Sequence, residues 1–138
     1  MQSRLHPYLN FPENTRDAME FYLSVFGGKL QMMTFKDFNA SQDPSEDDLI
    51  MHAELAGGND ITILASDAPA RMEYRPGNNF SLSLVGDNEA ELTNYFEKLS
   101  DGGTVTQPLV KAGWGDTFGM CIDPFGVNWI CNISAPKA

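Results

Sequence analysis

The residues best suited to chemistry in this chain are two histidines and a glutamate. One residue separates His52 from Glu54, so a β-strand would carry both on the same face, about 7 Å apart. An imidazole and a carboxylate at this spacing could form an acid–base pair, supply two metal ligands, or be joined in a salt bridge. His6 is the other histidine of the sequence. The catalytic candidates are therefore His6, His52 and Glu54, with no role assigned to any of them.

Sequence motifs of the common catalytic machineries are absent. The chain has no Gly-x-Ser-x-Gly motif, no phosphate-binding loop followed by Lys and Ser or Thr, and no Gly-x-Gly-x-x-Gly motif. Its 19 acidic residues outnumber its nine basic residues, which gives a net charge of −10. Because nucleic-acid binding requires a basic surface, we expect no nucleic-acid partner.

A set of polar residues alternates with apolar ones along the predicted strands. If the strands curl in the same direction, these residues line one partly polar cavity for a small ligand. Alternatively, they face water, as one side of an antiparallel sheet often does. The set consists of His6, Tyr8, Asn10, His52, Glu54, Thr62, Ser81, Ser83, Asn128 and Asn132. From this set and one loop, the expected ligand-binding residues are Tyr8, Asn10, Thr62, Ser81, Ser83, Trp114 and Asn128.

The loop residue is Trp114, which lies between Gly113 and Gly115 in the segment 111–116. Glycine weakens the local backbone preference, whereas an indole favours removal from water. Trp114 could therefore plug the end of the sheet permanently. It could also act as a lid that closes over a bound ligand.

The elements that must position these residues occur twice in the same order. Each half reads as a strand, a helix that ends at a Gly-Gly pair, a strand, a loop and a hairpin. Asn14 or Thr15 is predicted to cap the first helix, and Asp87 is predicted to cap the second. The predicted strands are residues 5–11, 29–35, 48–55 and 61–66 in the first half, and 80–85, 104–110, 117–122 and 127–133 in the second.

The repeated order predicts an α+β fold in which residues 1–138 form one domain of two βαβββ modules. The modules span about residues 1–67 and 79–138, and residues 67–79 form the linker. We expect a curved, mostly antiparallel eight-stranded sheet around a cleft, with the helices on its outer side.

The hairpin at the end of the chain turns at Asp123-Pro124-Phe125-Gly126. A four-residue turn pairs Ile122 with Val127. Unless a bulge shifts this register, Cys121 and Cys131 then lie on opposite faces of the hairpin, out of reach of a disulfide. Trp129 then faces the helix. We expect no membrane partner, because the chain has no apolar run of about 20 residues. Reduced cysteines and an N-terminus without an apolar core predict a cytoplasmic protein.

Several stretches resemble the PhnB-like branch of the vicinal oxygen chelate superfamily, which includes glyoxalases, bleomycin resistance proteins and dioxygenases. The resemblance covers nearly the whole chain and implies paired βαβββ modules and a homodimer. It is carried by Pro7-Tyr8-Leu9-Asn10-Phe11, Ala18-Met19-Glu20-Phe21-Tyr22, Val25-Phe26-Gly27-Gly28, Met51-His52-Ala53-Glu54-Leu55, Trp114-Gly115-Asp116, Phe118-Gly119-Met120 and Asp123-Pro124-Phe125-Gly126-Val127-Asn128-Trp129.

Metal-dependent members of the superfamily take their ligands from the first, fourth, fifth and eighth strands. The resemblance places His6 at the first position, Thr62 or Leu64 at the fourth strand, Ser81 at the fifth, and Ile130 where a glutamate is expected at the eighth. One imidazole among hydroxyl and alkyl groups holds a divalent cation poorly. We therefore expect no metal and no cofactor.

The resemblance and the alternation together predict a PhnB-like, glyoxalase-like protein that binds a small molecule in its cleft without a metal. One alternative is a lyase or isomerase of the glyoxalase type, which uses a metal or His and Glu as acid and base. Another is a resistance protein of the bleomycin-binding type that sequesters a bulky cationic drug.

Overall fold

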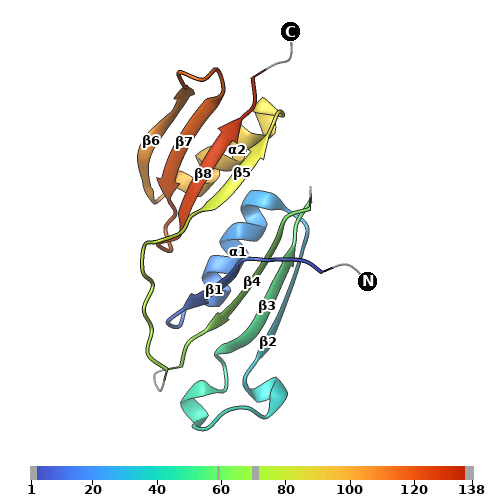
Figure 1. The fold of residues 1–138 in the computed structure, drawn as a ribbon. Helices are drawn as coiled ribbons and strands as arrows, with labels where there is room; N and C mark the ends of the chain where they lie inside the picture. Colours follow the sequence, from blue (N-terminus) through green and yellow to red (C-terminus); the bar gives the residue numbers. More distant parts are fainter. Residues whose placement is uncertain (1–2, 59, 70–71, 136–138) are drawn as a thin grey trace. The chain divides into compact units, whose positions relative to one another are not determined.

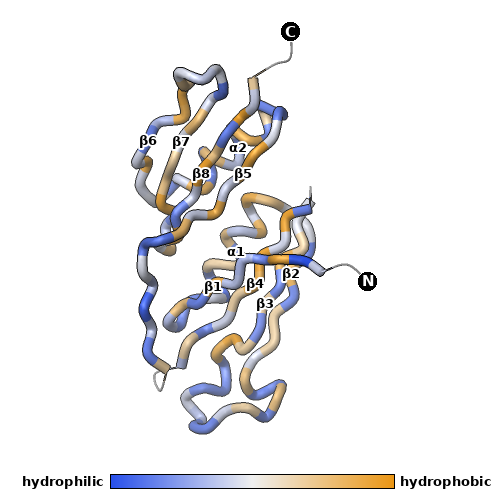
Figure 2. Tube along the Cα trace, viewed as in Figure 1, coloured by the Kyte–Doolittle hydropathy of each residue, from blue (hydrophilic) through white to orange (hydrophobic). Residues whose placement is uncertain are grey.

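The computed structural model describes residues 3–58, 60–69 and 72–135, which form two compact units, Met1–Gly77 and Asn78–Ala138. Each unit holds one α-helix and one four-stranded sheet (Figure 1). The segment between the two sheets is largely hydrophilic (Figure 2), as expected for the predicted linker. Residue 59 of the turn before the fourth strand and residues 70–71 of the linker lie outside the described residues.

Unit 1 contains β1 (Tyr8–Phe11), α1 (Thr15–Phe26), β2 (Lys29–Thr34), β3 (Ile50–Ala56) and β4 (Thr62–Asp67). Two 3₁₀ turns, Lys36–Phe38 and Pro44–Glu46, lie between β2 and β3. The strand order is β1-β4-β3-β2, in which β1 runs parallel to β4 and the other pairs are antiparallel.

Unit 2 contains β5 (Leu82–Gly86), α2 (Glu89–Ser100), β6 (Thr104–Lys111), β7 (Thr117–Ile122) and β8 (Asn128–Ile133). Its strand order, β5-β8-β7-β6, and its single parallel pair repeat those of unit 1. The prediction of an α+β fold with two βαβββ modules is therefore confirmed. The first strand of each module is shorter than predicted, because pairing with its parallel neighbour begins only at Tyr8 and at Leu82.

Each helix packs on one face of its own sheet. In unit 1, α1 contacts β2, β3 and β4, and its residues Met19 and Tyr22 are fully buried. In unit 2, α2 contacts all four strands, and Leu92 and Leu99 are buried there. We call the opposite side of each sheet its helix-free face. Polar and large apolar side chains alternate with buried ones onto this face, as the sequence predicted.

The caps of both helices differ from the prediction. Asn88, not Asp87, caps α2, because its side chain accepts a hydrogen bond from the Glu91 backbone N–H at 3.1 Å. At α1 the Asn14 side chain makes no capping bond. Instead, Asp67 at the end of β4 accepts a hydrogen bond from the Thr15 N–H at 2.9 Å and another from the Ile50 N–H at 2.8 Å. A single buried carboxylate thus joins the helix to two strands.

The hairpin register predicted at the chain end is wrong by one residue. The loop spans five residues, because the Asp123 N–H donates to the Val127 carbonyl while Gly126, at φ 86°, donates to Asp123. Ile122 therefore pairs with Asn128 rather than with Val127. A left-handed glycine after a tight turn adds this extra residue.

The corrected register moves both cysteines to the side of the helix. Cys121 pairs with Trp129 and Cys131 with Gly119, so the prediction of opposite faces is wrong. Both thiols are free, as predicted, and buried. Desolvation raises the pKa of each thiol to about 11, which leaves little reactive thiolate at neutral pH. The cytoplasmic location stays a prediction.

Candidate functional site

The helix-free face of unit 1 carries His52 and Glu54, two of the three catalytic candidates. The strand register aligns Tyr8, Leu64, Glu54 and Gln31 in one row across the sheet. His52 lies close to Tyr8, with 6.1 Å between the ring centroids and 39° between the ring planes. In the described part of the chain no ion pair joins His52 to Glu54, so the salt-bridge interpretation of this pair is not supported.

The other predicted residues of unit 1 are distributed around this row. Ser66 and Asn10 lie side by side on β4 and β1, and the Ser66 hydroxyl donates to Asn10 Oδ1 at 3.5 Å. Thr62 pairs with Ala56 at the opposite end of β4. His6 is half-buried and lies before β1 rather than within it, contrary to the predicted strand.

The helix-free face of unit 2 combines amides with larger apolar side chains. Ser83 is aligned with Ile130 and Met120, and the next row joins Val85, Asn132, Phe118 and Val110. Asn128 donates to the Phe80 carbonyl at 3.4 Å, which ties β8 to the residues before β5. Ser81 is exposed in that same lead-in segment.

Trp114 lies at the tip of the hairpin between β6 and β7. Its side chain is 65% exposed and meets the edge of Phe118, with ring centroids 5.5 Å apart. The loop is a closed turn, because the Ala112 N–H donates to the Asp116 carbonyl and the Gly115 N–H to the Ala112 carbonyl. The indole is thus an exposed aromatic surface on a hydrogen-bonded turn, not a buried plug.

Asp116, which the prediction missed, anchors this turn to β8. One carboxylate oxygen accepts from Asn132 Nδ2 at 3.0 Å, and the other accepts from the Ala135 N–H at 2.8 Å. These hydrogen bonds, from Asn132 first and Ala135 next, hold the pKa of Asp116 below its usual value. Strand alternation put Asn132 on the cavity side, but nothing in the sequence indicated that Asp116 would be its partner.

The residues at the superfamily's metal positions do not fit a divalent cation. Leu64 and Ile130 bring alkyl groups to the fourth and eighth strands, and Ser81 brings a hydroxyl. Over the described ranges, no three His, Cys, Asp or Glu side chains gather closely enough to bind a metal ion. We therefore derive no chemical step that uses a metal.

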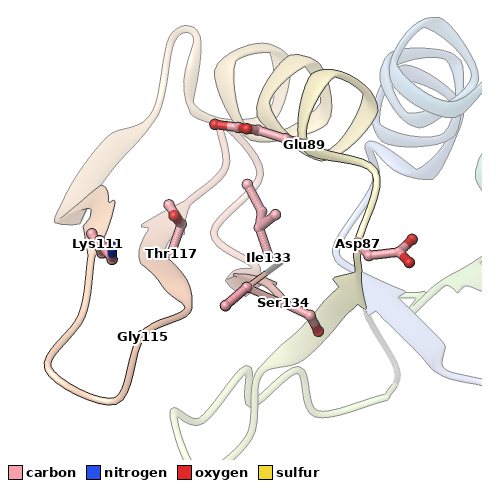
Figure 3. A pocket seen from close by; sticks show the side chains of 8 residues that line it. Asp87, Glu89, Lys111, Gly115, Thr117, Ile133 and Ser134 are labelled. Atoms are coloured by element: carbon pink, nitrogen blue, oxygen red, sulfur yellow. The ribbon is translucent and has the colours of Figure 1, made fainter. Parts of the chain in front are cut away.

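A separate hollow of about 590 Å³ lies in unit 2, where α2 begins and the last strand ends. Its walls include Lys111, Thr117, Ile133 and Ser134 below Glu89, whereas the Asp87 side chain points away from Thr117 and Ile133 (Figure 3). Ile133 is buried on the side of the helix, so this hollow is distinct from the helix-free face. None of the predicted site residues lines this hollow. Its walls come from four separate segments of the chain.

Comparison with known families agrees with this architecture. The model of the glyoxalase/bleomycin resistance protein/dioxygenase superfamily matches residues 4–130. The chain belongs to this superfamily. The resemblance noted in the sequence is thereby confirmed.

Individual relatives cover nearly the whole chain. Protein PA1353 from Pseudomonas aeruginosa is 36% identical, with a TM-score of 0.83 over 98% of this chain and 100% of that one. A PhnB protein from Bacillus cereus has a TM-score of 0.76 at 21% identity, over 96% of this chain and 100% of that one. Protein YjdN from Escherichia coli is 28% identical over 94% of each chain. These similarities support the fold.

Neither α-helix in the described residues is long and apolar enough to cross a membrane.

Proposed function

We propose that this superfamily member binds a small aromatic molecule against the helix-free faces of its sheets, without a divalent metal. The observation that carries the proposal is an aromatic pair, the exposed Trp114 and the half-buried Phe118, beside the amide of Asn132. Ligand sites combine apolar and aromatic walls with a few polar groups that orient the ligand, and this part of unit 2 has that composition.

An enzymatic role has narrower support. His52 next to Tyr8 could exchange a proton with a bound molecule, and Glu54 lies two residues further along β3. However, no hydrogen bond among the described residues orients the His52 ring, which a general base usually requires. A lyase or isomerase role for His52 and Glu54 is therefore secondary. Sequestration of a cationic drug would rest on the net charge of −10, which also serves solubility.

The proposal is tested through the two indole N–H signals in the ¹⁵N-edited NMR spectrum. We expect 4-methylphenol, used as a probe at millimolar concentration, to shift the Trp114 signal and leave the Trp129 signal in place. Trp129 is 3% exposed and donates to Asp123 Oδ2 at 2.8 Å, so it serves as an internal control. A Trp129→Phe variant assigns the two signals. A probe that leaves the Trp114 signal unmoved at saturating concentration contradicts the proposal.

We further propose that the protein forms a two-fold homodimer, as the family resemblance implies. Each four-stranded sheet has two edge strands, β1 and β2 in unit 1 and β5 and β6 in unit 2. Open edges favour pairing with further chains unless something protects them. Light scattering at micromolar concentration should give twice the 15.3 kDa mass of one chain. The mass of a single chain would contradict the dimer.

A further inference from the structure

The hydrogen bond between Asp116 and Asn132 determines which end of the Asn132 amide remains available. A carboxylate only accepts hydrogen bonds, so the Asn132 NH₂ group must be the one that faces Asp116. The 3.0 Å distance from Nδ2 to Asp116 Oδ2 agrees with this orientation. The lowered pKa of Asp116 keeps the carboxylate ionised at neutral pH. Among the described residues nothing donates to Asn132 Oδ1, which is left as an acceptor.

The available acceptor lies among apolar side chains of the helix-free face. Asn132 is paired with Phe118 on one side and with Val85 on the other. Trp114 extends the aromatic surface beyond Phe118, and the side chains of Val85 and Trp114 are 68% and 65% exposed. A flat ring placed on this surface would therefore bring its substituents close to the Asn132 amide.

We propose that Asp116 is a positioning residue that sets ligand specificity, because it holds Asn132 Oδ1 toward a ligand on the helix-free face of unit 2. The corresponding ligand class is an aromatic molecule that carries a hydrogen-bond donor, such as a phenol or an arylamine. This inference rests on the proposed function and adds the chemical class to it. Neither the strand alternation nor the superfamily's metal positions assign any role to Asp116.

The selectivity follows from the cost of an unpaired acceptor. A ring with a donor replaces the water that Asn132 Oδ1 loses, whereas a ring without one covers the amide oxygen and leaves it without a partner. Sites built around such a polar group reject analogues that lack its partner more strongly than apolar pockets reject a change in size. Because Asp116 occupies the NH₂ group, the amide cannot turn to suit a ligand that only accepts.

The test compares two similar probes, of which only one carries a hydrogen-bond donor. 4-Methylphenol carries a hydroxyl donor, and in 4-methylanisole a methyl group replaces that proton. We expect the unaltered chain to bind 4-methylphenol about tenfold more tightly, as measured by NMR titration, since one hydrogen bond to a polarised acceptor has roughly this effect. In the Asn132→Leu variant both probes should bind with nearly equal affinity. In Asp116→Asn the preference should fall several-fold, because the substituted side-chain amide can donate to Asn132 Oδ1 and release the Asn132 amide.

Asn94→Leu is the matched control, because it removes an exposed amide from α2 on the opposite side of the sheet. This variant should keep the tenfold preference. If the unaltered chain binds both probes equally, the specificity inference is wrong while the proposed function stands. A preference that persists in both Asp116→Asn and Asn132→Leu also refutes the inference. If neither probe binds the unaltered chain, the proposed function fails and the inference fails with it.

Discussion

Replacing Gly103 with alanine should strongly destabilise unit 2. A Cβ atom at this position would overlap the carbonyl oxygen of Ile122, the last residue of β7, and would crowd Asp123. Gly28 has the same relation to Ala56, the last residue of β3, and in addition has φ 97°. Because backbone atoms cannot move aside without breaking the sheet, we expect each substitution to lower the free energy of unfolding by about 4 kcal/mol or more. Urea titration followed by circular dichroism measures the loss.

Gly58→Ala and Gly113→Ala are the matched controls. A Cβ atom at either position meets nothing within 4 Å, and neither backbone has a positive φ. Both controls should therefore unfold within about 0.5 kcal/mol of the unaltered chain, the usual range for a surface substitution. Equal unfolding midpoints for Gly103→Ala and Gly113→Ala would contradict the close approach of Gly103 to the Ile122 carbonyl oxygen.

Replacing Asp123 with alanine should produce the second-largest loss of stability. This carboxylate is 3% exposed and accepts hydrogen bonds from the backbone N–H groups of Phe125 and Val127 and from Trp129 Nε1. Without it, donors in and beside the core lose their partner, each at about 1–3 kcal/mol. We expect a decrease of about 3 kcal/mol in the free energy of unfolding and a clear shift of the Trp129 indole N–H signal.

The Asp123→Asn variant distinguishes the contribution of the hydrogen bonds within the turn from that of the hydrogen bond to Trp129. Its remaining oxygen can still accept from Phe125 and Val127, but its NH₂ group would face the Trp129 indole N–H, donor against donor. This variant should therefore fall between the unaltered chain and Asp123→Ala. Asp48→Ala removes an exposed carboxylate and is the control for the change in charge. Equal stability of Asp123→Ala and Asp48→Ala would mean that the buried carboxylate contributes nothing.

The repeated architecture was predictable because its signals are local. The two Gly-Gly pairs marked the helix ends, and the structure adds their physical reason, since Gly28 and Gly103 approach the carbonyl groups of equivalent strands. Strand alternation likewise identified the helix-free faces, including the positions of Tyr8, Glu54 and Asn132. Local turn chemistry and a two-residue period are properties that a short window of sequence contains.

The remaining features depend on contacts between distant residues. Asp67 caps α1 from 52 residues away, and Asp116 bonds to Asn132 across 16 residues. The register of the last hairpin depends on the left-handed conformation of Gly126, which added one residue to the loop and moved both cysteines. The hollow beside Glu89 and Thr117 draws its walls from four segments that no single pattern joins.

The central claim is that an aromatic ligand binds on the helix-free face without a divalent metal. The most direct measurement is a ¹H–¹⁵N spectrum of the EDTA-treated chain, recorded while 4-methylphenol is added. The account predicts shifts that cluster at the Trp114 indole, Phe118 and Asn132, with Glu89 and Thr117 of the hollow unaffected. Shifts confined to Glu89 and Thr117, or shifts that appear only after a divalent metal is restored, would contradict it.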